Sequence, residues 1–338
     1  MPAVARRVGQ PVRVVARTPL AGGYHGGVER VDLDGAPPVV VKRARSVEVA
    51  ALRAVAVVPG VEHPRLLAAG PDWVVTDFHD GVPLAEGPDV PDGVWTTLAR
   101  VHAHWWRRRP RGIPVTDGQW WRRLCRDRIR PHLAAAAARC GDPGGRGAAA
   151  RDAGAGGRDA EPAGPDAGPA GPDAALAAPE GGRPAGGAAV GGDAAEAAVY
   201  RRGVDLLDAW AEHPGMHAAL TGLPRTLTHG DPHRGNVLLA AAGPVLLDWG
   251  NARVAPPGFD LAVLRAQGAV DLGPYRAEFA RLAGAPSAEL LAVEARCADA
   301  WAHVGYLGFA ADHLGAARVG ELLDGAARAL DGLAAPAR

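Results

Sequence analysis

Three side chains in the second half of the chain have the types and spacing that phosphoryl transfer requires. Asp231 and Asn236 belong to the segment 229–236, which reads HGDPHRGN, and Asp248 follows twelve residues after Asn236. A carboxylate can accept the proton of an attacking hydroxyl, and a second carboxylate with an amide oxygen suits magnesium, which prefers hard oxygen ligands. We therefore expect Asp231 to be the catalytic carboxylate and Asn236 and Asp248 to be metal ligands.

The composition singles out a fourth residue. The chain contains one lysine, Lys42, against 36 arginines, and two asparagines, Asn236 and Asn251. The abundance of Ala, Gly, Pro and Arg indicates a GC-rich coding bias, so a surviving lysine is a candidate for a task that arginine cannot perform. The alternative is a surface lysine that survived by chance, and only its position in the fold can decide between the two.

The first eighty residues have the pattern of a small sheet with one helix. β-branched and apolar runs predict strands at 12–16, 28–33, 39–41, 65–69 and 73–78. A glycine-dense turn at 21–27 separates the first two strands, and a helix is expected at 47–58, ended by a Pro-Gly pair.

The rest of the chain is expected to be mainly helical around one hairpin. Helical spacing predicts helices at 91–107, 119–139 and 199–212, with further helices from 259 to 333 broken near 273, 284 and 315. Short strands at 237–239 and 245–247 flank a turn, so the hairpin should return Asp248 toward Asn236. Residues 141–198 are mainly Ala, Gly, Pro, Asp and Arg, and we predict a disordered insertion there, because such a segment cannot bury enough apolar surface to order itself.

At these residues the chain resembles the aminoglycoside phosphotransferase and choline kinase superfamily, which is related to protein kinases. The segment 229–236 matches its H-G-D-x-x-x-x-N signature, and Asp248-Trp249 matches its D-W form of the kinase D-F-G motif. Residues 259–262, FDLA, resemble a downstream motif that anchors the catalytic loop. Arg234 stands where the family often has proline.

The resemblance implies a bilobal α+β fold of the protein-kinase type. Residues 1–81 would form an antiparallel-sheet nucleotide-binding lobe with one helix, and residues 82–338 a mainly helical catalytic and substrate lobe. ATP and Mg²⁺ are the implied cofactors, and the acceptor is a hydroxyl of a small molecule, such as an aminoglycoside-like antibiotic, an amino alcohol or a sugar.

The resemblance also assigns nucleotide-binding residues in the first lobe. Lys42 would hold phosphate oxygens and pair with Glu48 on the following helix. Gly22 and Gly23 would cover the phosphates, and Thr76 and Phe78 would lie near the adenine.

Three alternative interpretations stay open at this point. The chain could be a nucleotide-binding pseudokinase that acts as a binding module. His229, Asp231 and His233 could instead form the metal site of a hydrolase, since two histidines and a carboxylate can bind zinc. Arginines interleaved with tryptophans at 105–130 could contact nucleic acid, although a solvated arginine face with inward tryptophans is the favoured interpretation.

Composition limits the remaining classes of partner. Lys plus Arg and Asp plus Glu both number 37, so net charge does not indicate nucleic acid or membrane binding. The three cysteines have no paired spacing, which favours free thiols in a reducing compartment. No stretch approaches the roughly 20 apolar residues of a membrane span, and the first residues lack an apolar signal core, so we expect a cytoplasmic protein.

Overall fold

The computed structural model describes residues 4–5, 9, 11–20, 27–85, 89–141, 190–268 and 271–333. The chain divides into two compact units, and each unit is assembled from two separate stretches of sequence. The first comprises Met1–Val115 and Pro224–Pro286, and the second comprises Thr116–Leu223 and Ser287–Arg338. All described residues of the expected phosphoryl-transfer site belong to the first unit.

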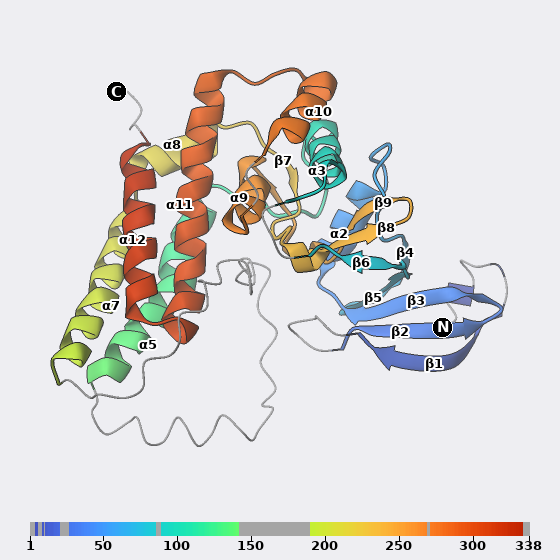
Figure 1. Cartoon of the computed structure of the whole chain (residues 1–338), viewed down its shortest axis with the longest axis horizontal. Coiled ribbons are helices and arrows are strands. Elements are labelled where there is room, and N and C mark those ends of the chain that lie inside the picture. The colour runs from blue at the N-terminus through green and yellow to red at the C-terminus, as the bar shows by residue number, and fades with distance from the viewer. Residues whose placement is uncertain are drawn as a thin grey trace. The chain divides into compact units, whose positions relative to one another are not determined.

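The first unit begins with a five-stranded antiparallel sheet in the order β1-β2-β3-β5-β4 (Figure 1). Its strands are β1 (Arg13–Pro19), β2 (Glu29–Asp34), β3 (Ala36–Arg43), β4 (Leu66–Ala69) and β5 (Trp73–Asp77). Alternate residues of a strand face opposite sides of a sheet. One face buries a small cluster that includes Val31, Val39 and Val75. The opposite face of β3 carries Lys42.

One helix, α2 (Ser46–Val55), connects β3 to β4. It buries Glu48 together with the apolar residues Leu52 and Val55. Ser46 is the first helical residue, and Arg45 occupies the N-cap with an extended backbone. Glu48 lies in the first turn, where a carboxylate is favoured by the helix dipole.

Two smaller sheets follow in the same unit. β6 (Gly81–Pro83), β8 (Val237–Ala240) and β9 (Gly243–Leu246) form one sheet in the order β6-β8-β9, and β7 (Thr226–Thr228) pairs with β10 (Arg253–Ala255). In the β8-β9 hairpin Val237 lies opposite Leu246, and Leu247 N donates to Asn236 O at 2.8 Å. The hairpin therefore places the residues just before β8 beside those just after β9, as the sequence predicted.

Three helices complete the first unit: α3 (Asp92–His104), α9 (Gly258–Ala266) and α10 (Gly273–Ala283). α3 packs along α10 and contributes Trp95 and Leu98 to the main core, which also contains Leu52 and Trp249. This core joins α2 to the segment after β9, so the elements that carry the site residues share one set of packing contacts.

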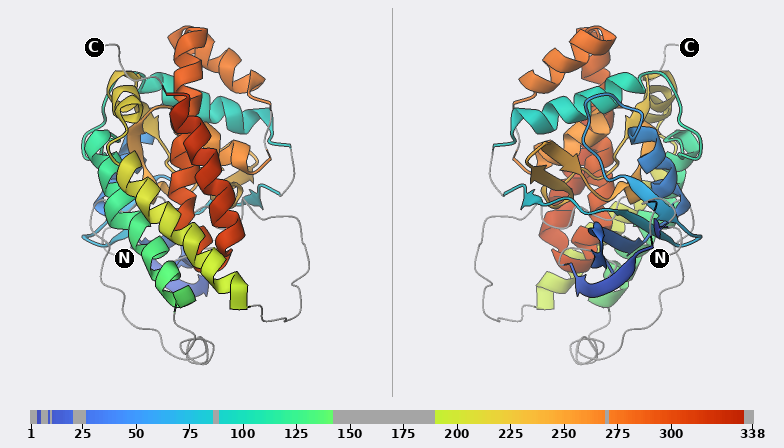
Figure 2. Two further views of the ribbon diagram at one scale, coloured as in Figure 1. Left: turned by 90° about the vertical axis from the view of Figure 1, so that its left-hand side faces the viewer. Right: turned by 90° about the vertical axis from the view of Figure 1, so that its right-hand side faces the viewer.

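The second unit is helical. Its elements are α4 (Gly118–Arg123), a π-helical turn (Leu124–Ile129), α5 (Arg130–Gly141), α7 (Val190–Trp210), α8 (Pro214–Gly222), α11 (Ala288–His313) and α12 (Ala316–Asp331). Helices α5, α7, α11 and α12 run side by side (Figure 2). Among the described residues, no helix is both long enough and apolar enough to cross a bilayer.

The tryptophans and arginines of the second unit separate as the favoured interpretation predicted. Trp120 and Trp121 are buried, and Trp121 Nε1 donates to Trp210 O at 2.7 Å. Arg122 and Arg126 are exposed and form ion pairs with Glu212. At 120–126, inward tryptophans and paired arginines therefore form the solvated helix face that was the favoured interpretation.

Two predicted boundaries are wrong. α5 continues to Gly141 and α7 begins at Val190, so residues 190–198 of the predicted insertion are helical. Residues 193–198, DAAEAA, are rich in alanine, the best helix former, and this preference continues the helix that was expected only from 199. Residues 142–189 of the predicted insertion lie outside the described residues.

We expect Leu98→Ala to destabilise the first unit by about 2–5 kcal/mol, because Leu98 is fully buried in the main core and its removal leaves a cavity. Leu282→Ala on α10 is the matched control: Leu282 is 45% exposed, and its loss should change the free energy of unfolding by less than about 0.5 kcal/mol. Urea unfolding followed by tryptophan fluorescence measures both. Equal effects of the two substitutions would contradict the core assignment.

Candidate active site

The single lysine forms two ion pairs that join three elements of the first unit. Lys42 lies near the end of β3, and its Nζ is 2.6 Å from Glu48 Oε1 on α2. The same Nζ is 2.8 Å from Asp248 Oδ1, directly after the β8-β9 hairpin. The Glu48 side chain is 4% exposed and that of Asp248 is 56% exposed. One ammonium group therefore links a buried carboxylate to an accessible one.

The charges of this trio follow from its burial and pairing. Burial lowers the pKa of Lys42, but the charges of Glu48 and Asp248 outweigh it and raise the pKa above its usual value. Burial raises the pKa of Asp248, but the charge and hydrogen bond of Lys42 lower it by more. The pKa of Asp248 is therefore below its usual value. Burial dominates at Glu48 and raises the pKa of its carboxyl. At neutral pH the site thus presents an ammonium and an ionised Asp248.

Asp248 adopts a left-handed backbone conformation, with φ 59° and ψ 66°. Non-glycine residues rarely adopt this region, and aspartate is among the more tolerant. The neighbouring Trp249 is buried, and its Nε1 donates to Leu246 O at 2.9 Å. The buried indole therefore stabilises the turn in which Asp248 has its left-handed backbone conformation.

The carboxylate of Asp260 holds the backbone of the loop that carries Asp231. Asp260 Oδ2 accepts from His229 N at 2.7 Å, and Oδ1 accepts from Gly230 N at 2.8 Å. Asp260 lies on α9 and is fully buried. The motif at 259–262 thus anchors the loop that carries Asp231, which is the contact that the resemblance implied.

The anchor extends into a buried polar network. His102 Nε2 donates to Asp260 Oδ2 at 3.1 Å, and His102 Nδ1 lies 3.0 Å from the hydroxyl of Tyr275. Thr226 Oγ1 donates to His102 O at 2.7 Å. The buried Asp260 carboxylate is therefore satisfied by hydrogen bonds from several elements, which is the condition for burying a charged group without a large cost.

His229 organises the loop and leaves no ring nitrogen for a metal. Its Nε2 donates to Leu247 O at 2.7 Å, and its Nδ1 accepts from Asp231 N at 3.3 Å. Burial lowers the pKa of His229, in agreement with a neutral ring. His233 is engaged too, since its Nδ1 accepts from Gly235 N at 3.1 Å. Among the described residues, no group of three His, Cys, Asp or Glu side chains is placed to hold a metal ion, so the geometry does not support the zinc-hydrolase alternative.

Asp231 and Asn236 both lie in the loop at 229–236 and contact each other. Asp231 is 4% exposed, and its backbone O accepts from Asn236 Nδ2 at 3.0 Å. This bond uses the amide nitrogen of Asn236, so its amide oxygen points away from Asp231 O. An amide oxygen beside β8 and the Asp248 carboxylate beyond β9 are the hard donors that suit Mg²⁺.

Arg234 has a contact that sequence reasoning left open. It is 6% exposed, and its Nη1 donates to Ala85 O at 2.5 Å and to Asp89 O at 3.2 Å. Its backbone N donates to Gln267 Oε1 at 2.7 Å. The guanidinium therefore ties the catalytic loop to the segment after β6. The only signal of this role in the sequence was an arginine where the resembling family often has proline.

Of the other predicted nucleotide-binding residues, the structure describes Thr76 and Phe78 but not Gly22 and Gly23. Thr76 is buried on β5 opposite Val40, which places it on the same sheet face as Lys42. Phe78 follows β5, and the Arg30 guanidinium lies 4.5 Å from its ring centroid. Gly22 and Gly23 lie outside the described residues.

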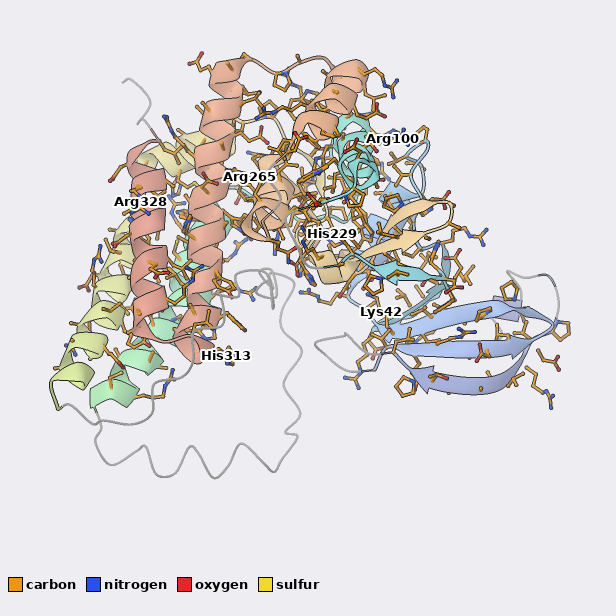
Figure 3. The ribbon with its side chains drawn as sticks, viewed as in Figure 1. Lys42, Arg100, His229, Arg265, His313 and Arg328 are labelled. Carbon is orange, nitrogen blue, oxygen red and sulfur yellow. The ribbon has the colours of Figure 1, made fainter. Side chains whose placement is uncertain are left out.

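Figure 3 labels Lys42 on β3 and His229 in the loop after β7, the two residues that mark the sides of the site. Around them the structure gathers Lys42, Glu48 and Asp248 in one cluster and Asp231 with Asn236 in a second. Leu247 directly precedes Asp248 of the first cluster. Its N donates to Asn236 O and its O accepts from His229 Nε2, so it joins the first cluster to the loop that carries the second.

The comparisons with known proteins identify a family and a fold. The model of a phosphotransferase enzyme family matches residues 16–298. A proposed fructosamine-3-kinase from Thermobifida fusca YX-ER1 is 19% identical, with 97% of each chain covered and a TM-score of 0.52. A second proposed fructosamine-3-kinase, from Haemophilus somnus 129PT, is 10% identical, with 96% of this chain and 95% of that chain covered and a TM-score of 0.52. No protein with a curated function has a matching sequence. The chain therefore has the kinase-like α+β fold that the sequence predicted.

We expect Gly230→Ala to destabilise the catalytic loop strongly. Gly230 has φ +84°, and a Cβ there would lie 2.0 Å from Asn251 O, which is backbone and cannot move aside cheaply. Gly284→Ala is the matched control, because Gly284 has the same φ of +84° with nothing within 4 Å. The measurement is the free energy of unfolding by urea, in which Gly230→Ala should exceed the control by about 1–3 kcal/mol. Similar losses for the two variants would refute the close approach at Gly230.

Proposed function

Because the chain belongs to the phosphotransferase enzyme family, we propose that it transfers the γ-phosphate of ATP to a hydroxyl of a small molecule. The observation that carries the proposal is the position of the sole lysine, whose Nζ lies 2.6 Å from Glu48 and 2.8 Å from Asp248. A chance surface lysine would not join a buried helix carboxylate to the residue that ends the catalytic hairpin.

Lys42 is proposed to bind phosphate oxygens. Its pairing with Glu48 fixes the side chain, and its raised pKa keeps the ammonium charged at neutral pH. A compact ammonium with three donors can contact two carboxylates and a phosphate together, whereas a planar guanidinium has a different donor geometry.

Asp231 is proposed to orient the acceptor hydroxyl and take its proton. The loop backbone on either side is fixed by Asp260 and by the Asn236 amide, so the carboxylate is held in place before substrate binds. Asn236 and Asp248 would hold Mg²⁺, which when bound supplies positive charge to the phosphate oxygens.

For the acceptor we propose only a class of molecule, and for the nucleotide we propose the residues that would lie near it. Aminoglycoside-like antibiotics, amino alcohols and sugars all offer the required hydroxyl. Thr76 and Phe78 are proposed to lie near the adenine, and Gly22 and Gly23 to cover the phosphates. The division into a nucleotide-binding lobe at 1–81 and a catalytic and substrate lobe at 82–338 is part of the same proposal.

A nucleotide-binding pseudokinase is the second candidate. What favours the active enzyme is the presence of all four polar groups, Lys42, Asp231, Asn236 and Asp248, in one compact unit. A binding module has no need of a carboxylate such as Asp231, held on a loop anchored by buried hydrogen bonds.

The decisive experiment screens hydroxylated metabolites and antibiotics with ATP and Mg²⁺ and detects phosphorylated products by mass spectrometry. Asp231→Asn should lower turnover by about 10²–10⁴-fold, because the amide cannot accept the proton of the acceptor. Asp72→Asn, at an exposed turn of the same unit, is the matched control and should leave turnover unchanged. Equal background turnover in wild type and Asp231→Asn, with ATP still bound, would favour the pseudokinase.

Lys42→Arg tests the task assigned to the lysine. We expect a lower kcat and a higher KM for ATP, since a guanidinium cannot reproduce the ammonium contacts with Glu48 and Asp248. Arg43→Lys, the reverse exchange at the exposed neighbouring position, should change neither value. Steady-state kinetics with varied ATP measures both, and an unchanged Lys42→Arg enzyme would remove Lys42 from the site.

A further inference from the structure

Asn251 is the second of the two asparagines in the chain, and the proposed function does not use it. It ends the short 3₁₀ turn Trp249–Asn251, directly after the proposed metal ligand Asp248. The same compositional bias that singled out Lys42 applies here, so Asn251 also calls for a physical reason.

The Asn251 side chain lies between a cation and the catalytic carboxylate. Its Oδ1 accepts from Arg45 Nη2 at 3.1 Å, and its Nδ2 lies 3.4 Å from Asp231 Oδ2, to which it donates. Arg45 Nη2 also donates to Gly250 O at 3.0 Å. The guanidinium thus fixes both the backbone beside Asn251 and the oxygen of its amide.

The chemistry of the neighbours sets the orientation of this amide. Arginine offers only donors, and an ionised carboxylate offers only acceptors. The amide oxygen must therefore face Arg45, and the amide nitrogen must face Asp231. An aspartate at 251 has no donor for Asp231 when ionised, and an aliphatic residue has neither group.

The backbones of the two loops are in contact as well. A side chain at Gly230 would collide with Asn251 O at 2.0 Å, so the loop before Asp231 lies directly against Asn251. Two independent features, a backbone contact and a side-chain hydrogen bond, therefore place Asn251 against the catalytic loop.

We infer that Asn251 is a positioning residue that holds the Asp231 carboxylate in the orientation required to meet the acceptor hydroxyl, with its own amide oriented by Arg45. This inference rests on the proposed function. The 3.4 Å separation is long for a hydrogen bond, and bonds of this kind tighten when the substrate complex forms. Arg45 occupies the N-cap position of α2, so the helix that supplies Glu48 also places the guanidinium that orients the Asn251 amide.

The test compares steady-state kinetics of the full chain and its variants, with ATP, Mg²⁺ and an acceptor found in the screen. Asn251→Ala should lower kcat by about 10–100-fold, the range expected for one lost hydrogen bond to a charged group, with KM for ATP within about twofold of wild type. A purely structural role would lower the melting temperature and leave kcat per folded molecule unchanged. The melting temperature is therefore measured for every variant.

Two further variants keep the inference falsifiable if Asn251→Ala folds poorly. Asn251→Asp has the same shape and keeps the acceptor for Arg45, but it places a second carboxylate against Asp231, so kcat should fall at least as much as in Asn251→Ala. In the Arg45→Ala and Asn251→Ala double variant, the loss in kcat should be smaller than the product of the two single losses, since both act on Asp231 through one amide. Arg43→Ala, at an exposed position two residues away, is the control for charge removal.

The outcomes separate this inference from the proposed function. If wild type is active and Asp231→Asn is not, while Asn251→Ala or Asn251→Asp keeps the wild-type kcat, the positioning role is wrong and the kinase stands. If wild type and Asp231→Asn have the same background turnover, the proposed function fails and this inference fails with it.

Discussion

The ion pairs of Lys42 are the interaction on which the site depends. A buried glutamate is costly to ionise unless a cation lies beside it, and Glu48 has that cation only because β3 and α2 bring Lys42 to it. The second pair, to Asp248, extends the same charge to the residue after the hairpin. One ammonium group thus sets the relative position of a strand, a helix and a turn.

A second constraint acts on the loop at 229–236, which carries Asp231 and Asn236. Asp260 is fully buried. Its two oxygens accept from the backbone N–H groups of His229 and Gly230 and from the His102 ring. A loop of only a few residues has little rigidity of its own, so its shape is imposed by a neighbouring helix. Removing one partner would leave a buried charge unsatisfied, which makes this network costly to alter.

The sequence predicted what depends on local pattern. The five strands, α2 and the β8-β9 hairpin follow from β-branched runs, helical spacing and turn residues, and the hairpin explains why Asn236 and Asp248 approach each other. The roles of Arg234 and Asn251 were not predicted. The side-chain partners of Arg234 are 145 and 149 residues away, those of Asn251 are 20 and 206 residues away, and no periodicity relates them. The predicted start of α7 is wrong because the alanine-rich residues 193–198 resemble the low-complexity segment that precedes them in composition.

The contacts that were missed have a common physical cause. Arg234 and Asn251 both act through groups that bond to backbone or to another side chain in a fixed direction, so their effect depends on geometry within a few tenths of an ångström. Residue type alone reports that such a group can donate or accept, but not which partner it meets. Rare residues limit the possible partners: the chain has one lysine and two asparagines, and all three lie at the proposed site. Composition singled out Lys42 before its partners were known, whereas the position of Asn251 became apparent only in the structure.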